Sequence, residues 1–100
     1  MSFDEFQAAI RAGAAPAGGL GPALEALWHD ARGDWDRAHA CAQSAPGHAG
    51  AWVHAYLHRK EGDAANAGYW YARAGRPPEA GRLEQEWETI ARELLAPAQS

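Results

Sequence analysis

Residues that favour β-strands are scarce in this sequence. β-Branched side chains pack well on a pleated sheet, and among 100 residues they occur only as Ile10, Val53, Thr89 and Ile90. Alanine, the best helix former, occupies 25 positions. The composition therefore excludes a substantial sheet and predicts an all-α fold.

Long apolar runs are also missing. No stretch approaches the roughly 18 consecutive apolar residues that a membrane-spanning helix needs. The acidic start of the chain, residues 1–5, lacks the cationic and apolar regions of a signal peptide. These two absences predict a cytoplasmic protein without a membrane partner.

Basic residues are few and scattered. The chain has 9 Lys and Arg against 13 Asp and Glu, its formal net charge is −4, and it contains no cationic run. Affinity for nucleic acid depends largely on clustered Lys and Arg side chains that contact phosphates. The charge pattern therefore argues against a nucleic-acid partner.

Patterns that indicate catalysis are nearly absent. The single cysteine, Cys41, excludes an internal disulfide and is expected to pack as a small buried hydrophobe. His39 lies two residues before it, so the two side chains point to different faces of a helix and do not form a thiolate pair. The glycine-rich segment 18–21 lacks the Lys and Ser/Thr of a phosphate-binding loop. Nothing here indicates an enzyme.

Local start and stop signals are consistent with one helical domain over residues 1–100. Ser2 and Glu5 form a capping box, which predicts a first helix over about 3–12. A Gly- and Pro-rich connector follows over 13–21.

Two tandem helix hairpins are predicted after this connector, at about 22–46 and about 50–75. Each turns at a Gly-Asp pair, and the two pairs, Gly33-Asp34 and Gly62-Asp63, lie 29 residues apart. Glycine can adopt the left-handed conformation that ends a helix, and aspartate can cap the next helix. The chain therefore contains an internal repeat.

A capping helix over about 78–96 is predicted to follow the hairpins. Its apolar stripe is formed by Leu83, Trp87, Ile90 and Leu94. Its carboxylates are expected to form a solvated face, and they are Glu79, Glu84, Glu86, Glu88 and Glu93.

The repeat resembles the tetratricopeptide family, whose units are helix-turn-helix hairpins with small residues where the helices cross. The second unit, Ala51–Pro77, has Ala67, Tyr71 and Ala74 in the family's small, aromatic, small order. The first unit has Ala42 where the aromatic is expected. The segments 28–35 and 52–63 are also similar to those of small bacterial proteins without an assigned role.

The resemblance implies a small helical-repeat scaffold that binds an unidentified protein or peptide. In such a hairpin, Trp52, Tyr56 and Arg59 lie on the edge of the first helix that lines the concave groove, where aromatic residues can anchor a partner. Two hairpins without further helices are expected to be only marginally stable. The end helices are therefore expected to act as caps, with self-association into a homo-oligomer as the alternative.

Histidines on the first helices of the hairpins support a second hypothesis, a metal- or small-ligand-binding protein. His54 and His58 lie four residues apart on one helical face, with Glu61 one turn further along. Two such histidines can share a divalent metal, but Zn²⁺ needs three or four ligands. The spacer lacks the glutamate of a zinc-protease motif.

A further ligand has to come from elsewhere, and the candidates are His29, Asp30, His39 and Glu61. We expect His29, His54 and His58 to form one polar cluster, in which Asp30 can serve as a bridge. The alternative is that these histidines are hydrogen-bonded packing residues.

Overall fold

The computed structural model describes residues 1–13 and 19–96, and within them it has six helices and no strand. The helices are α1 (Phe3–Arg11), α2 (Pro22–Ala31), α3 (Trp35–Ser44), α4 (Gly47–Lys60), α5 (Ala64–Arg73) and α6 (Leu83–Leu95). The predicted all-α fold is confirmed. Residues 14–18 of the predicted connector lie outside the described residues. None of the described helices is long and apolar enough to cross a lipid bilayer.

The helix ends follow the local signals in the sequence. The Ser2 hydroxyl accepts a hydrogen bond from the Glu5 amide, and the Glu5 carboxylate accepts one from the Ser2 amide, which completes the capping box of α1. Gly33 and Gly62 have φ angles of 80° and 89°, a region that glycine adopts readily. The aspartates that follow them cap α3 and α5. Both predicted turns are therefore present.

The largest difference from the predicted boundaries is the start of α6, at Leu83 rather than at about residue 78. The carboxylate of Glu79 accepts hydrogen bonds from the backbone amides of the next two residues. Local bonds of this kind compete with helix formation. α4 begins at Gly47 rather than at about residue 50. The break between α3 and α4 is short, since it consists of only two extended residues, Ala45 and Pro46.

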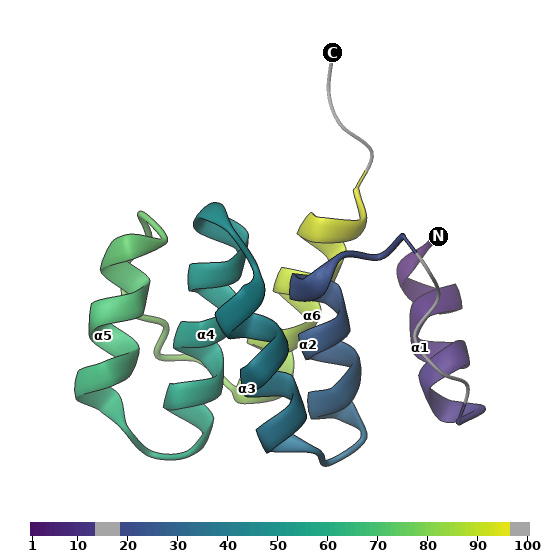
Figure 1. Cartoon of the computed structure of the whole chain (residues 1–100), viewed down its shortest axis with the longest axis horizontal. Helices are drawn as coiled ribbons and strands as arrows, with labels where there is room; N and C mark the ends of the chain where they lie inside the picture. The colour runs from purple at the N-terminus through teal and green to yellow at the C-terminus, as the bar shows by residue number, and fades with distance from the viewer. Residues whose placement is uncertain (14–18, 97–100) are drawn as a thin grey trace.

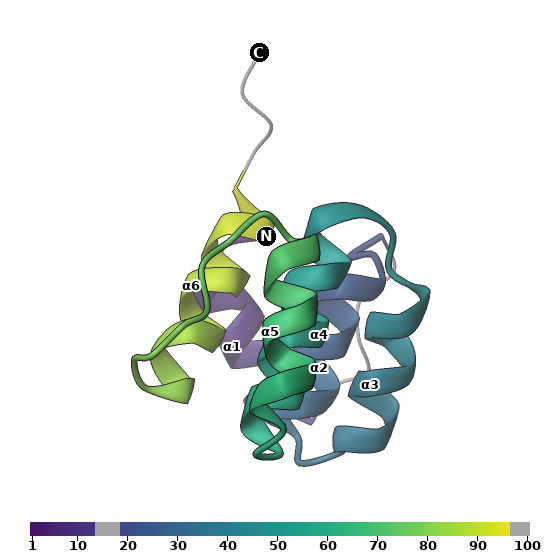
Figure 2. The ribbon, with the colours of Figure 1, turned by 90° about the vertical axis from the view of Figure 1, so that its left-hand side faces the viewer.

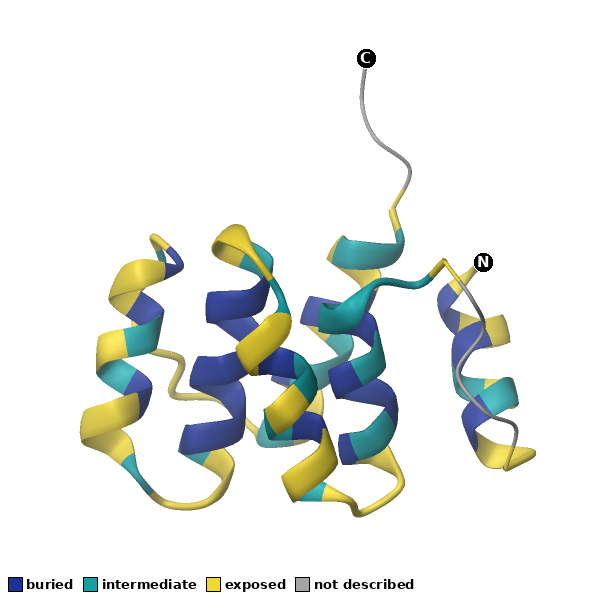
Figure 3. Ribbon diagram, in the orientation of Figure 1, coloured by how far each residue is buried: buried dark blue, intermediate teal, exposed yellow. Residues whose placement is uncertain are grey.

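α4 lies at the centre of the molecule. It packs against α3 and α5 and also against α2 and α6 (Figures 1 and 2), so that α3 and α6 lie on different sides of it. Every residue from Gly50 to His58 is buried (Figure 3). A helix that is buried all round has no solvent face on which to place polar side chains. The polar side chains of this buried stretch therefore need hydrogen-bond partners within the protein.

α6 and α1 complete the core on the side of α4 that is remote from α3. Ile90 is fully buried, and the indole nitrogen of Trp87 donates a 3.1 Å hydrogen bond to the carbonyl of Leu27 in α2. Phe6 of α1 stacks on Trp87 with ring centroids 5.9 Å apart, and it meets Trp28 edge-on. Aromatic side chains therefore fill the space that the many alanines leave.

Candidate metal centre

The polar side chains of α4 lie on two opposite faces, as its 3.6-residue period requires. His54 and His58 face α3 and α5, because their ring partners come from those helices. Tyr56 and Arg59 face α2 and α6 and bond to side chains there. One helix therefore serves two separate polar sites.

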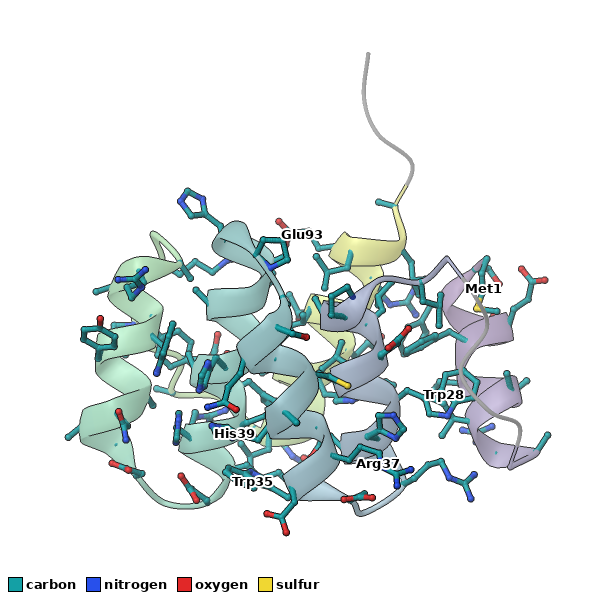
Figure 4. All side chains as sticks on the ribbon, viewed as in Figure 1. Met1, Trp28, Trp35, Arg37, His39 and Glu93 are labelled. Atoms are coloured by element: carbon teal, nitrogen blue, oxygen red, sulfur yellow. The ribbon has the colours of Figure 1, made fainter. Side chains whose placement is uncertain are left out.

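Three imidazoles converge on the first face, from His39 of α3, which is labelled in Figure 4, and from His54 and His58 of α4. One ring nitrogen of each lies within 4.8 Å of the others. The Nε2 atoms of His39 and His54 are 3.0 Å apart, and the rings of His54 and His58 stack with centroids 4.9 Å apart. We refer to these three residues as the histidine cluster.

Neighbouring side chains hold the rings of the histidine cluster in place. Trp35 stacks on His39 with ring centroids 4.8 Å apart, and Trp70 stacks on His54 at 3.9 Å. The indole nitrogen of Trp35 also donates a 3.0 Å hydrogen bond to the carbonyl of Leu57. The two indoles restrict the rotation of both rings, so the nitrogens stay close to one another.

A carboxylate orients the third ring. The Nδ1 atom of His58 lies 2.6 Å from Oε1 of Glu61, which leaves Nε2 of His58 for a metal. Metal-binding histidines commonly donate their second N–H to a carboxylate in this way, and the contact fixes both tautomer and orientation. Glu61 therefore fits the role of a supporting residue better than that of a ligand.

Electrostatics keep His39 and His54 in their metal-binding protonation state. Burial, and then the neighbouring His39 and His58, lower the pKa of His54 from 6.5 to about 4. Burial, followed by His58, also lowers the pKa of His39. Both of these rings are therefore neutral at pH 7. Neutral imidazole is the form that binds a transition metal.

The spacing of one nitrogen pair fits a tetrahedral ion. Nitrogens that bind Zn²⁺ at 2.0–2.1 Å with tetrahedral angles lie about 3.3 Å from one another. The 3.0 Å between the Nε2 atoms of His39 and His54 is close to this value. In the structure one of these two rings donates a hydrogen bond to the other. An ion bound there would take the place of the shared proton.

The expected membership of the cluster was wrong in one residue. His29 is not among the converging histidines, and His39 occupies the third place. The reason is the direction in which α4 presents its histidines: His54 and His58 face the second helices of the hairpins, whereas His29 lies on α2. Asp30 does not bridge the histidines either, because this residue of α2 contacts the opposite face of α4.

A second group of possible ligands adjoins the first, formed by His58, Glu61 and Asp63. Both carboxylate oxygens of Asp63 are already used, because they accept from the backbone and side-chain nitrogens of Asn66. Asp63 therefore serves as the cap of α5. The histidine cluster is the stronger candidate for a metal.

Buried carboxylates dominate the opposite face of α4. Asp30 accepts hydrogen bonds of 2.8 Å from the Tyr56 hydroxyl and from the Lys60 ammonium. Glu86 of α6 accepts one of 2.6 Å from the Tyr71 hydroxyl and one of 2.9 Å from the guanidinium of Arg59. We refer to these groups, together with Trp52, as the carboxylate network.

This network corrects two expectations. Trp52 and Tyr56 were expected in an open groove, but only 5% and 3% of their surfaces are exposed because α6 covers them. Glu86 was expected on a solvated face, but it is 3% exposed and accepts from the indole nitrogen of Trp52 at 3.3 Å. A signal was present in the sequence, since Glu86 is spaced three residues from Leu83 and four from Ile90, on the apolar stripe.

One further residue, Cys41, is less buried than expected, and another, Tyr69, was not among the predicted binding residues. Cys41 is half-buried rather than buried, and burial raises the pKa of its thiol, which disfavours the reactive thiolate. Tyr69 is the most exposed large aromatic among the described residues, at 55%. No local pattern distinguishes Tyr69 from the other aromatics of the hairpins.

Comparison with protein-family models, with curated proteins and with solved structures finds no match to this chain. The geometry of the two polar sites is therefore the basis on which a function can be proposed.

Proposed function

We propose that the protein binds one divalent transition-metal ion, of the zinc class, at the histidine cluster. The observation that supports this proposal best is the convergence of His39, His54 and His58 from two helices, with the Nε2 atoms of His39 and His54 at a separation that suits a tetrahedral ion. Imidazole ligands suit Zn²⁺, Cu²⁺ and Ni²⁺, whereas Mg²⁺ and Ca²⁺ prefer oxygen ligands.

The geometry favours metal binding over a groove that binds peptides. A tetratricopeptide-like scaffold needs the edge of its first helices open, and the anchors expected there were Trp52, Tyr56 and Arg59. In this chain α6 lies on that edge, and Glu86 bonds to Trp52 and Arg59. A peptide could reach Trp52 and Arg59 only by displacing α6 from the core.

The proposal is tested by equilibrium dialysis of the purified protein against Zn²⁺, with metal measured by elemental analysis. We expect one ion per chain. Replacing His39 or His54 with Gln should weaken binding by about 10- to 100-fold or more, because each change removes one of three ligands. His29→Gln is the matched control, since His29 does not belong to the cluster. Equal losses in the control and the cluster variants would show that binding is nonspecific.

A further inference from the structure

An open pocket of about 480 Å³ lies directly beside the histidine cluster, between α3, α4 and α5. His54 belongs both to the lining of this pocket and to the cluster. The lining continues through Ala42, one turn from His39 on α3, and through Ala51, one turn from His54 on α4. One helical turn rises about 5.4 Å, so a small molecule in the pocket lies within reach of an ion at the cluster.

The lining of the pocket has a distinctive charge. Its described residues include no Asp or Glu, although the chain has 13 of them and a net charge of −4. Its ionisable side chains are those of His48, His54 and Arg73. The guanidinium of Arg73 stands over the ring of Trp70, 5.5 Å from its centroid. Such a lining favours an anion.

Part of the remaining lining is apolar and can contact a small organic group. Beside the polar side chain of Gln43, this part consists of Trp70, Ala42, Ala45, Pro46 and Ala51. The volume of the pocket lies within the roughly 300–1,000 Å³ that is typical of small-ligand sites.

The ion itself leaves one position for such a ligand. Among the described residues the cluster offers three protein ligands, and a tetrahedral ion takes four. Structural zinc sites are closed by four protein ligands, whereas sites with three keep a position that exchanges with solutes. His54 joins the cluster to the pocket, so the pocket is the place from which a solute reaches that position.

We infer that the ion at the histidine cluster takes a small organic carboxylate as its exchangeable fourth ligand, held in the pocket lined by Trp70 and Arg73. This inference rests on the proposed metal binding. The carboxylate replaces a metal-bound water, its charge is balanced by the ion and by Arg73, and its apolar part contacts the alanine and tryptophan walls.

The test uses the whole chain loaded with one equivalent of Co²⁺, whose visible absorption reports changes in coordination. Benzoate is the probe, and benzylamine, which has a similar shape and the opposite charge, is the control ligand. We expect benzoate to shift the cobalt bands in a saturable manner and benzylamine to leave them unchanged. Isothermal titration should show that benzoate binds the loaded protein at least about tenfold more tightly than the metal-free protein.

A pair of variants tests the pocket independently of the ion. Arg73→Gln should weaken benzoate binding about tenfold, the loss expected for one charge-assisted hydrogen bond, without changing the affinity for Co²⁺. Arg37→Gln is the matched control, because Arg37 is exposed on α3 and does not line the pocket.

The outcomes separate the two proposals. If Co²⁺ binds at the cluster but benzoate leaves its bands unchanged, or binds equally without the ion, the inference is overturned and the proposed function stands. If the protein binds no Co²⁺, the proposed function fails and the inference fails with it. Equal effects of Arg73→Gln and Arg37→Gln would exclude the pocket as the place of binding.

Discussion

The two faces of α4 solve the problem of buried polar groups in different ways. In the carboxylate network, Asp30 and Glu86 meet hydroxyl, indole, ammonium and guanidinium donors. Donors match acceptors, and each carboxylate has a cation beside it. In the histidine cluster three like groups face one another, and among the described residues the only carboxylate hydrogen-bonded to a ring is Glu61, at Nδ1 of His58.

This difference is the one expected between a structural site and a binding site. A buried network in which every group has a complementary partner stabilises one arrangement of helices and needs no further molecule. The histidine cluster is also satisfied, since no buried side-chain nitrogen or oxygen in the described part of the chain lacks a partner. One nitrogen of each of its rings nevertheless lies within 4.8 Å of the others, and a cation could replace the proton between His39 and His54. The two faces of α4 should therefore respond differently to mutation, to metal and to acid.

The largest expected effect is on the carboxylate network. Glu86→Ala leaves Arg59, Tyr71 and Trp52 without their common acceptor in the core, and removing one partner of a buried ion pair typically costs about 3–5 kcal/mol. Urea unfolding measures the loss. Glu84→Ala, on the exposed side of α6, is the matched control and should change stability by less than about 0.5 kcal/mol. A similar, small loss for both variants would show that the network contributes little.

The next effect is the stabilisation of the histidine cluster by its ion. Because the ligands come from α3 and α4, bound Zn²⁺ ties the first hairpin to the second. At a free ion concentration 100 times the dissociation constant, the free energy of unfolding should rise by about 2.7 kcal/mol. Thermal unfolding with and without Zn²⁺ measures this rise, and His39→Gln should abolish it. A rise that persists in that variant would place the ion elsewhere.

Acid should weaken the fold through the histidine cluster. The pKa of His54 is about 4 in the folded chain, below its ordinary 6.5, so the unfolded chain binds more protons between these values. Stability from this group is complete above pH 6.5 and is lost as the pH falls towards 4. His39 and His58, which face His54, add to the repulsion once they are protonated. Melting temperatures of the metal-free protein should fall less steeply over this range in His54→Gln; an unchanged slope would contradict the assignment.

The smallest expected change in stability is that of a histidine variant in the metal-free protein at neutral pH. His39→Gln removes one partly buried hydrogen bond to His54, and such a bond contributes about 0.5–1.5 kcal/mol. Without metal, this variant should therefore lose about 1 kcal/mol in urea unfolding, well below the loss for Glu86→Ala. A loss as large as that of Glu86→Ala would show that the histidine cluster, too, is mainly structural.

Local signals predicted the helices and turns well, because their causes lie within a few residues. The Gly-Asp pairs end one helix and cap the next, and the spacing of His54 and His58 places both on one face of α4. The third imidazole was not predictable in this way. His39 reaches the cluster only because α3 packs against α4, and no local pattern encodes that contact.

The burial of Tyr56 was missed for a related reason. The sequence shows an amphipathic last helix but does not show which face of the hairpins it covers. α6 packs on α4 and α2, and this closes the edge on which an open groove was expected. Glu86 was the available signal, since a carboxylate on an apolar stripe requires buried donors opposite it.

Zinc-edge X-ray absorption of the protein loaded with one equivalent of Zn²⁺ tests the central claim most directly. The signal from imidazole rings counts the histidines bound to the ion. We predict three imidazole nitrogens at about 2.0 Å and one further light atom, with one imidazole fewer in His39→Gln. A spectrum with one imidazole or none, or one that is identical in the wild type and in His39→Gln, would contradict a metal centre built from His39, His54 and His58.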